Sequence, residues 1–268
     1  MDFIGDMTAL RMSLAFGVLG FFLALEGWIP FRAPVQSKLQ HVATNLVIVG
    51  GNAVVVNLLV GGGLLLWSRR VEVEGWGLLN QLGWGPLAKV LVSVVLLDLI
   101  FFGNHWVNHH VPLLWRFHRA HHSDLDLDVS TGLRFHLGEV LVSTAVKGVS
   151  IAALGVPPLG FIISEMALLA AAQFQHSNLS LPKYLETPIR MFLVTPYMHW
   201  IHHSRRPREH NSNFGTMLSA WDRLFGTYFM DIRREEIKLG LDEYSSLDRV
   251  GILRFYLMPL GGSCRRIP

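Results

Sequence analysis

The sequence predicts an all-α integral membrane protein made of about four transmembrane or hairpin helices and a histidine-rich, water-facing part. Its composition is the first reason, because 51% of the residues are hydrophobic, 16% are charged and the mean hydropathy is +0.36. Several apolar runs also approach the ~20 residues that a spanning helix needs. Finally, twelve of the thirteen histidines lie between His105 and His210, next to these runs.

Two apolar runs precede this histidine-rich interval. Residues 9–28 are long enough to span a bilayer, and they begin too late and run too long for a signal peptide. Residues 42–67 predict a second span that is stopped by Arg69 and Arg70. Three glycines at 61–63 favour either close helix packing or backbone flexibility at this point.

Two further runs flank the first histidines. Residues 87–102 predict a third span, which leads directly into them. The run at 141–174 is longer and is interrupted by Val156-Pro157-Pro158. Proline disfavours the helical conformation of the residue before it, so this run predicts a helical hairpin that returns to the side on which it entered. No comparable run follows Ser177, and the C-terminal third is expected to be water-facing or interfacial.

The hairpin places residues 103–138 and 177–268 on the same side of the membrane. These two regions hold 16 of the 23 Lys and Arg residues, so the positive-inside tendency predicts that they face the cytoplasm. No linker or repeat divides the chain, which predicts a single domain over residues 1–268. The net charge of +3 without dense basic clusters argues against nucleic-acid binding. A single cysteine, Cys264, excludes an intrachain disulfide and a thiolate cluster.

Four groups of histidines carry the candidate chemistry. The first has the spacing i, i+4, two later blocks have the spacing i, i+3, i+4, and a lone histidine ends the returning arm of the hairpin. Such spacings gather imidazoles on one helix face. The nine residues are His105, His109, His118, His121, His122, His176, His199, His202 and His203. Together they could supply four or five nitrogens to each of two metal ions, and imidazole suits Fe, Zn, Cu and Ni alike.

Two other classes of membrane protein use buried histidines. A haem-binding electron carrier would need few of them, on facing helices rather than in adjacent triplets. A metal transporter would place polar ligands at the bilayer midplane, whereas these histidines lie beyond the predicted spans. Outside the nine, His110 points about 100° away from His109 on a helix and is expected at the surface. His41 is expected to be interfacial and without a role.

Polar residues near the histidines are candidates for ligand support, because a ligating imidazole usually donates its other N–H to a carboxylate or carbonyl. Asp98 lies two helical turns before His105 in an apolar run, where an unpaired carboxylate is costly. It is expected to support a ligand, with simple helix packing as the alternative. Weaker candidates, for which a solvated or capping role is the alternative, are Asp128, Glu139, Asn178 and Asp222.

Several stretches of this chain are recognisable. They are Asp98–His109, Leu113–His136 (LLWRFHRAHHSDLDLDVSTGLRFH), Phe174–Asn178 (FQHSN), Thr195–Ser204 (TPYMHWIHHS), Asn211–Gly215 (NSNFG) and Trp221–Tyr228 (WDRLFGTY). Through them the chain resembles the sterol desaturase / fatty acid hydroxylase superfamily, in particular its bacterial sterol desaturase-like branch. The resemblance covers roughly residues 90–230.

The resemblance implies a membrane core beneath a cytosolic helical cap that holds a di-iron centre. It implies that the nine histidines are both metal ligands and catalytic residues, that the cofactor is two Fe²⁺ ions, which Zn can replace in purified protein, and that O2 is the co-substrate. Members of the superfamily hydroxylate or desaturate lipid chains or sterols, or cleave ether lipids. The implied location is a bacterial inner membrane, with the catalytic side in the cytoplasm.

The chain departs from the family pattern at a few positions. Ala172 stands where the fatty acid hydroxylase branch often has a further histidine, and Trp106 often differs in relatives. His136 is followed by Leu137 instead of proline, so it is expected to be either a tenth ligand or a supporting residue. His210 stands where similar sequences often carry a non-ligand residue, and it is expected to lie outside the ligand set.

Electrons for such chemistry must come from another protein, because the sequence has no dinucleotide-binding glycine fingerprint and no haem-attachment motif. An external reductase with a ferredoxin or a cytochrome b5-like carrier is therefore the expected partner, besides the lipid substrate. The basic residues Arg205, Arg206 and Arg208 could dock an acidic carrier. A solvated or headgroup-binding face is the alternative for such a run.

Overall fold

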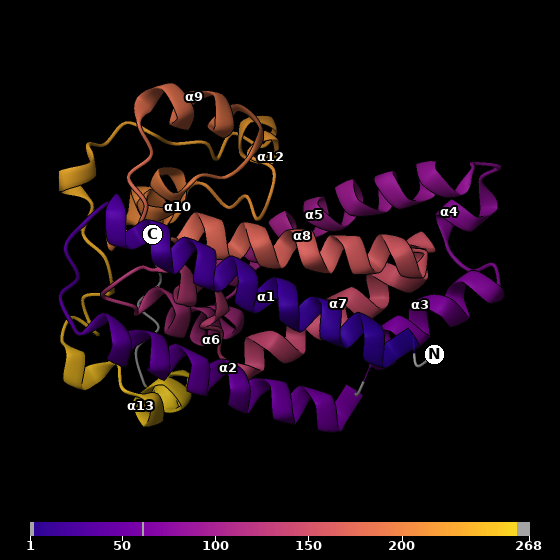
Figure 1. The fold of residues 1–268 in the computed structure, drawn as a ribbon, viewed down its shortest axis with the longest axis horizontal. Coiled ribbons are helices and arrows are strands. Elements are labelled where there is room, and N and C mark those ends of the chain that lie inside the picture. The colour runs from indigo at the N-terminus through magenta and orange to yellow at the C-terminus, as the bar shows by residue number, and fades with distance from the viewer. Residues whose placement is uncertain (1–2, 61, 262–268) are drawn as a thin grey trace.

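The computed structural model describes residues 3–60 and 62–261, so Cys264 lies outside the described residues (Figure 1). Within them the regular structure is helical, and β pairing is limited to isolated bridges, which confirms the all-α prediction. Five of the described helices are long and apolar enough to cross a membrane. They are α1 (Phe3–Trp28), α2 (Lys38–Val60), α5 (Pro86–His110), α7 (Leu137–Leu154) and α8 (Pro158–His176).

The predicted hairpin is present as α7 and α8. Helix α7 ends at Gly155, which adopts a left-handed conformation with φ 74°, and Pro157 precedes the first residue of α8. A Cβ atom on Gly155 would lie 2.6 Å from the carbonyl oxygen of Trp76, so both backbone conformation and space require glycine there. Proline at the start of α8 suits a position whose N–H has no helical partner.

The second predicted span is shorter than expected. Helix α2 ends at Val60 instead of continuing to Trp67, and Gly62 has a left-handed φ of 71° before α3 (Gly63–Val73) begins. A left-handed residue cannot continue an α-helix, so Gly62 separates α2 from α3. Helix α3 packs against α7, where Trp67 Nε1 donates a hydrogen bond to the Gly148 carbonyl at 2.9 Å. The short α4 (Leu78–Gln81) then leads into α5.

The five long helices run along the longest axis of the molecule; most of the shorter elements gather around one end of them, and α3 and α4 lie at the opposite end (Figure 1). The first of these ends holds the last residues of α1, α5 and α8 and the first residues of α2 and α7. We call it the cap end. Its elements are α6 (Pro112–His122), η1 (Val129–Leu133), α9 (Lys183–Phe192), α10 (Pro196–His202), α11 (Pro207–His210), α12 (Ala220–Leu224), η2 (Arg234–Glu236), η3 (Leu247–Arg249), α13 (Ile252–Leu257) and η4 (Met258–Leu260).

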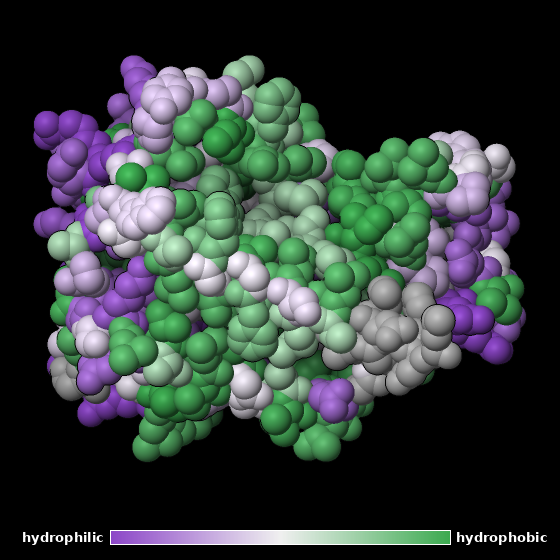
Figure 2. Space-filling model, in the orientation of Figure 1, coloured by the Kyte–Doolittle hydropathy of each residue, from purple (hydrophilic) through white to green (hydrophobic). Residues whose placement is uncertain are grey.

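The surface divides along the same axis. Figure 2 shows apolar side chains over the middle of the molecule and hydrophilic side chains at the cap end and at the opposite end. This is the distribution expected of a protein whose middle faces lipid tails. Under the cap, Trp200 and Ile201 of α10 are almost fully buried against Leu127 and Ile237. Burying one such side chain contributes about 1.5–3 kcal/mol, which holds α10 firmly in the cap.

His41 does not lie at an interface without a role, as the sequence had suggested. It is 4% exposed, its Nδ1 lies 2.8 Å from Asp128, and its Nε2 lies 2.9 Å from Asp124. The first turn of α2 is packed against the loop that precedes η1, and this long-range contact brings the carboxylates to the ring. His41 therefore joins α2 to the cap through a buried ionic network.

Candidate metal centre

Four helices bring the nine candidate ligands to the cap end. His105 and His109 occupy the last two turns of α5, and His176 is the last residue of α8. The three histidines of the first block lie on α6, while those of the second lie on α10 and immediately after it. All nine are buried, which places the site between the membrane-spanning helices and the cap.

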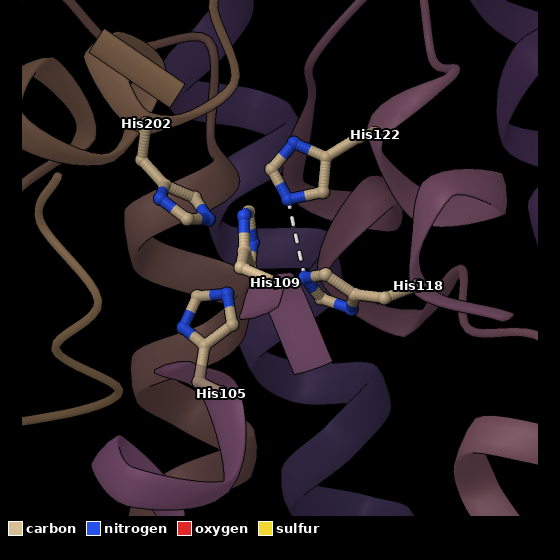
Figure 3. A group of neighbouring side chains, drawn as sticks. All are labelled: His105, His109, His118, His122 and His202. Atoms are coloured by element: carbon tan, nitrogen blue, oxygen red, sulfur yellow. Dashed lines mark hydrogen bonds between the residues drawn. The ribbon is translucent and has the colours of Figure 1, made fainter. Parts of the chain in front are cut away.

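The nine histidines form two groups, and within each group the ligand nitrogens lie within 4.8 Å of one another. The first group, shown in Figure 3, consists of His105, His109, His118, His122 and His202. The second consists of His121, His176, His199 and His203. These groups contain every histidine that the sequence analysis proposed as a ligand. His136, the undecided residue, belongs to neither of them.

Each three-histidine block contributes to both groups. In the first block His118 and His122 belong to the five-membered group, and His121 belongs to the four-membered one. The second block does the opposite, because only its middle residue, His202, joins the five-membered group. This division follows from helix geometry, since residues at i and i+4 are about 40° apart around the axis and residue i+3 lies on the other side of i. The two blocks therefore interlock across the site.

Hydrogen bonds fix how the rings are turned. Five of the nine present Nδ1 to an acceptor at 2.6–3.0 Å, so that Nδ1 carries the proton and Nε2 carries the free lone pair. The acceptors are the carbonyl oxygens of Phe214 (for His105), Arg134 (for His121), Ala172 (for His176) and Ser212 (for His202), and the carboxylate of Glu139 (for His118).

The four-membered group gives the clearest indication of a cation. The Nε2 atoms of His121 and His176 are 3.0 Å apart, yet both residues use Nδ1–H on a carbonyl, so neither Nε2 has a proton to share. His199 Nε2 lies 2.9 Å from His176 Nε2. Two ligands about 2.0–2.1 Å from one ion are about 2.9 Å apart at a right angle and about 3.4 Å apart in a tetrahedron. The residues therefore fit a metal ion, towards which the lone pairs converge.

Burial keeps these imidazoles neutral. For His122, His202 and His203, loss of solvent followed by the proximity of other histidines lowers the pKa well below the usual value of 6.5. An imidazole must be neutral to offer a lone pair to a metal. The site is thus ready to bind cations at neutral pH, without a carboxylate or thiolate in either group.

The residues proposed to support the ligands differ in whether they contact a histidine of the two groups. Glu139 contacts a candidate ligand directly, with Oε1 2.7 Å from His118 Nδ1. Asp98 accepts hydrogen bonds from Thr216, the Leu218 backbone N–H and Trp221, and none of these partners is a histidine. It therefore anchors the loop that follows Phe214, whose carbonyl accepts a hydrogen bond from His105.

Asp222 acts on the same loop. It accepts hydrogen bonds from the backbone N–H groups of Phe214 and Gly215 at 2.7 and 2.8 Å, and burial raises its pKa to about 6. The other two candidates form their hydrogen bonds outside the two histidine groups. Asp128 pairs with His41 and caps η1, while Asn178 binds the backbone of Arg32.

Three further histidines lie outside the two groups, and one of them, His210, packs against the five-membered group. His136 caps α7 by accepting from the Gly138 N–H, and its Nε2 lies 3.2 Å from the Tyr256 carbonyl. His110 is exposed and stacks on Trp106. His210, which the sequence analysis left out, is buried, and its ring centroid lies 4.7 Å from that of His109 and 4.6 Å from that of His122.

Sequence reasoning also missed the network behind His121. Burial opposes ionisation of Asp124, but the charges of His41 and Arg134 outweigh it and lower the pKa of Asp124 to about 2. Arg134 is fully buried, and its backbone carbonyl is the acceptor for His121 Nδ1. The only signal in the sequence was the density of charges in the segment that follows the first histidine block.

A cavity of about 430 Å³ opens beside the two groups. His105, His118, His121, His176 and His199 line one part of it. Most of the other lining residues come from α2, α5, α7 and α8, and although half of them carry a polar group, most of the cavity surface is apolar. A cavity of this size and lining accommodates part of a lipid chain next to the candidate metal ligands.

The fold and the site define a multi-pass membrane protein with two buried histidine groups beside an apolar cavity. The sequence model of the fatty acid hydroxylase family matches residues 90–227, which is more than half of the chain. The chain belongs to this family of oxidoreductases, as the resemblance had indicated.

Curated relatives support this assignment. The chain is 28% identical over 158 residues to the ornithine lipid hydroxylase OlsE of Rhizobium tropici, a match that covers 59% of this chain and 47% of the relative. It is 29% identical over 243 residues to the alkylglycerol monooxygenase of Xenopus tropicalis, covering 88% and 47%, and 26% identical over 142 residues to the cholesterol 25-hydroxylase of Rattus norvegicus, covering 53% and 47%. The chain thus spans about half the length of these relatives. No solved structure matches it.

Proposed function

We propose that this protein is a membrane-bound, O2-dependent oxygenase that hydroxylates or desaturates a C–H bond of a lipid, with two iron ions held by the nine histidines. The observation that carries the proposal is the convergence of the unprotonated Nε2 atoms of His121 and His176 at the wall of a largely apolar cavity. The names of the relatives, which are lipid hydroxylases and monooxygenases, support the same reaction class.

Each group of histidines would hold one ion. Imidazole ligands suit iron, and bound iron would supply the O2-derived oxidant that is strong enough to remove hydrogen from an unactivated carbon. Zinc binds to such sites as well and is expected to replace iron in protein purified without care.

The protein's own residues would contribute positioning. The acceptors at Nδ1 hold five of the nine rings in the tautomer that leaves Nε2 free for a metal ion, and the Glu139 carboxylate would make His118 a stronger ligand. The apolar wall of the cavity, which includes Phe101, Val140 and Leu168, would align the hydrocarbon and exclude water from the oxidation site.

The electrons would come from a separate reductase through a ferredoxin or a cytochrome b5-like carrier. Arg206 and Arg208 are exposed on the cap near the second histidine block and could dock an acidic carrier. All three arginines also have partners within the cap: Arg205 donates to the Leu239 carbonyl at 2.9 Å and pairs with Asp242, Arg206 donates to Glu209 at 3.1 Å, and Arg208 lies over the Phe229 ring. The excess of Lys and Arg over acidic residues in the cap supports a cytoplasmic orientation, and the membrane that we propose is a bacterial inner membrane.

The experiment that tests the proposal uses purified protein reconstituted with Fe²⁺ and supplied with O2 and a reductase system. Metal analysis is expected to give two iron ions per chain, without a haem absorption band. Comparing lipids by mass spectrometry between strains with and without the protein should then identify the substrate. A haem spectrum, or metal flux through protein in liposomes, would replace the proposal with a carrier or a transporter.

A further inference from the structure

The cavity has a second polar region, away from the histidines. Arg11 of α1, Lys147 of α7 and Glu165 of α8 all line it, and we call these residues the charged trio. Each lies inside a helix that is long and apolar enough to span a membrane. Ionisable side chains are expensive at such positions and usually have a function there.

The trio has two positively charged side chains and one carboxylate, so one positive charge has no counterion within it. Lys147 Nζ lies 2.7 and 2.9 Å from the two oxygens of Glu165, so this pair is closely matched. Arg11 reaches the same carboxylate through a single contact of 3.3 Å, and its side chain is 48% exposed. A guanidinium has five N–H donors, so Arg11 keeps most of its hydrogen-bonding capacity for another partner.

Helix geometry separates the trio from the metal ligands. On α8, the stretch from Glu165 to His176 corresponds to about 16 Å at the usual rise per residue. An extended hydrocarbon can cover this distance along the cavity wall, with one end at the trio and a carbon atom beside the histidines.

We propose that the charged trio binds the anionic end of the lipid substrate, a carboxylate or a phosphodiester, and that the chain reaches from there to the histidines. This inference rests on the proposed function for what happens to the lipid's hydrocarbon, because oxidation would occur at a carbon far from the anionic group. A planar guanidinium matches the oxygens of either group. A neutral alcohol or ester would leave the excess charge of the trio uncompensated.

Equilibrium binding of radiolabelled single-chain lipids to the purified protein in detergent tests the inference without turnover. Two pairs of probes differ in charge: palmitate with its methyl ester, and lysophosphatidylglycerol with monoacylglycerol. The wild type is expected to bind the anion of at least one pair about tenfold more tightly than its neutral counterpart, the effect of one or two charge-assisted hydrogen bonds. Acetate and inorganic phosphate should not compete at the same concentrations, since they lack the chain.

The variants assign the effect to the trio. Arg11→Gln should remove the preference for the anion and leave the binding of the neutral probe unchanged. Glu165→Gln should strengthen anion binding severalfold, because the carboxylate no longer competes for the two cations. The matched control is Arg70→Gln, which changes an exposed arginine of α3 that pairs with Glu74 outside the cavity. Iron content should be the same in all four proteins.

Equal binding of charged and neutral probes by the wild type would overturn the inference, and this result needs no variant. Loss of anion binding in a Glu165→Gln protein that keeps its iron would also contradict the inference. The trio would then serve only to hold the helices together. These outcomes are separate from those for the proposed function. A protein that oxidises lipids without any preference for anions refutes only the inference, while selective binding without oxidation refutes only the proposed function.

Discussion

Replacement of Glu139 by glutamine is the most direct test of how the protein tunes its metal site. The carboxylate lies 2.7 Å from His118 Nδ1, both side chains are buried, and Asn108 donates to the same oxygen at 3.3 Å. The amide keeps the size of the side chain and one acceptor oxygen, but it removes the charge that polarises the imidazole. Substitutions of this kind typically lower metal affinity 10- to 100-fold, or about 1.4–2.7 kcal/mol.

Competition with a chelator of known affinity would measure the change. The matched control is Glu165→Gln, the same substitution in the same cavity but about 16 Å from His176 along α8. We expect iron to be lost from Glu139→Gln at a lower chelator concentration, and the control to retain it like the wild type. If Glu139→Gln held iron as tightly as the wild type, the carboxylate would not support a ligand, and our account of the site around His118 would be wrong.

Three further substitutions, two of them with a matched control, test other parts of the protein. His202→Ala should lose bound iron and all activity while still inserting into the membrane, whereas His110→Ala should behave like the wild type in both assays; full activity of His202→Ala would refute the ligand set. Gly132→Ala should destabilise the protein by about 1–3 kcal/mol in thermal unfolding, because a Cβ there would lie 2.5 Å from a carbonyl oxygen of α8, and Gly83→Ala, with open space around it, should not. His210→Ala should release iron to a chelator faster, since its ring packs against two imidazoles of the five-membered group, and an unchanged rate would contradict this role.

Local patterns predicted most of the helices, because hydropathy and proline act within a few residues. The break at residues 156–158 was predictable for this reason, since proline restricts its neighbour directly. The break at Gly62 was not, because glycine permits a left-handed conformation without requiring it. Only packing against the rest of the protein decides between a straight helix and a break.

The same distinction applies to the site. Helix spacing predicts which histidines of one block lie near one another on a helix, whereas the packing of α5, α6, α8 and α10 brings the nine together. The roles of His41 and His210 depend on contacts between distant segments, such as the approach of α2 to the loop before η1. No pattern around either residue distinguishes a buried partner from an exposed one. The prediction for Asp98 was correct in part. Burial of a carboxylate in an apolar run predicted that it has hydrogen-bond partners, but not which residues these are.

The interlocking of the two histidine blocks has a consequence for how the protein acquires its cofactor. Because each block donates nitrogens to both groups, an ion in either group orders α6 and α10 together. If each group holds one ion, as proposed, the first ion would bear the conformational cost of arranging the second site, and the second ion would bind more tightly. Loading should be cooperative, so a preparation with an average of one iron per chain would be a mixture of empty and doubly occupied molecules. Average metal content would then report the fraction of competent protein.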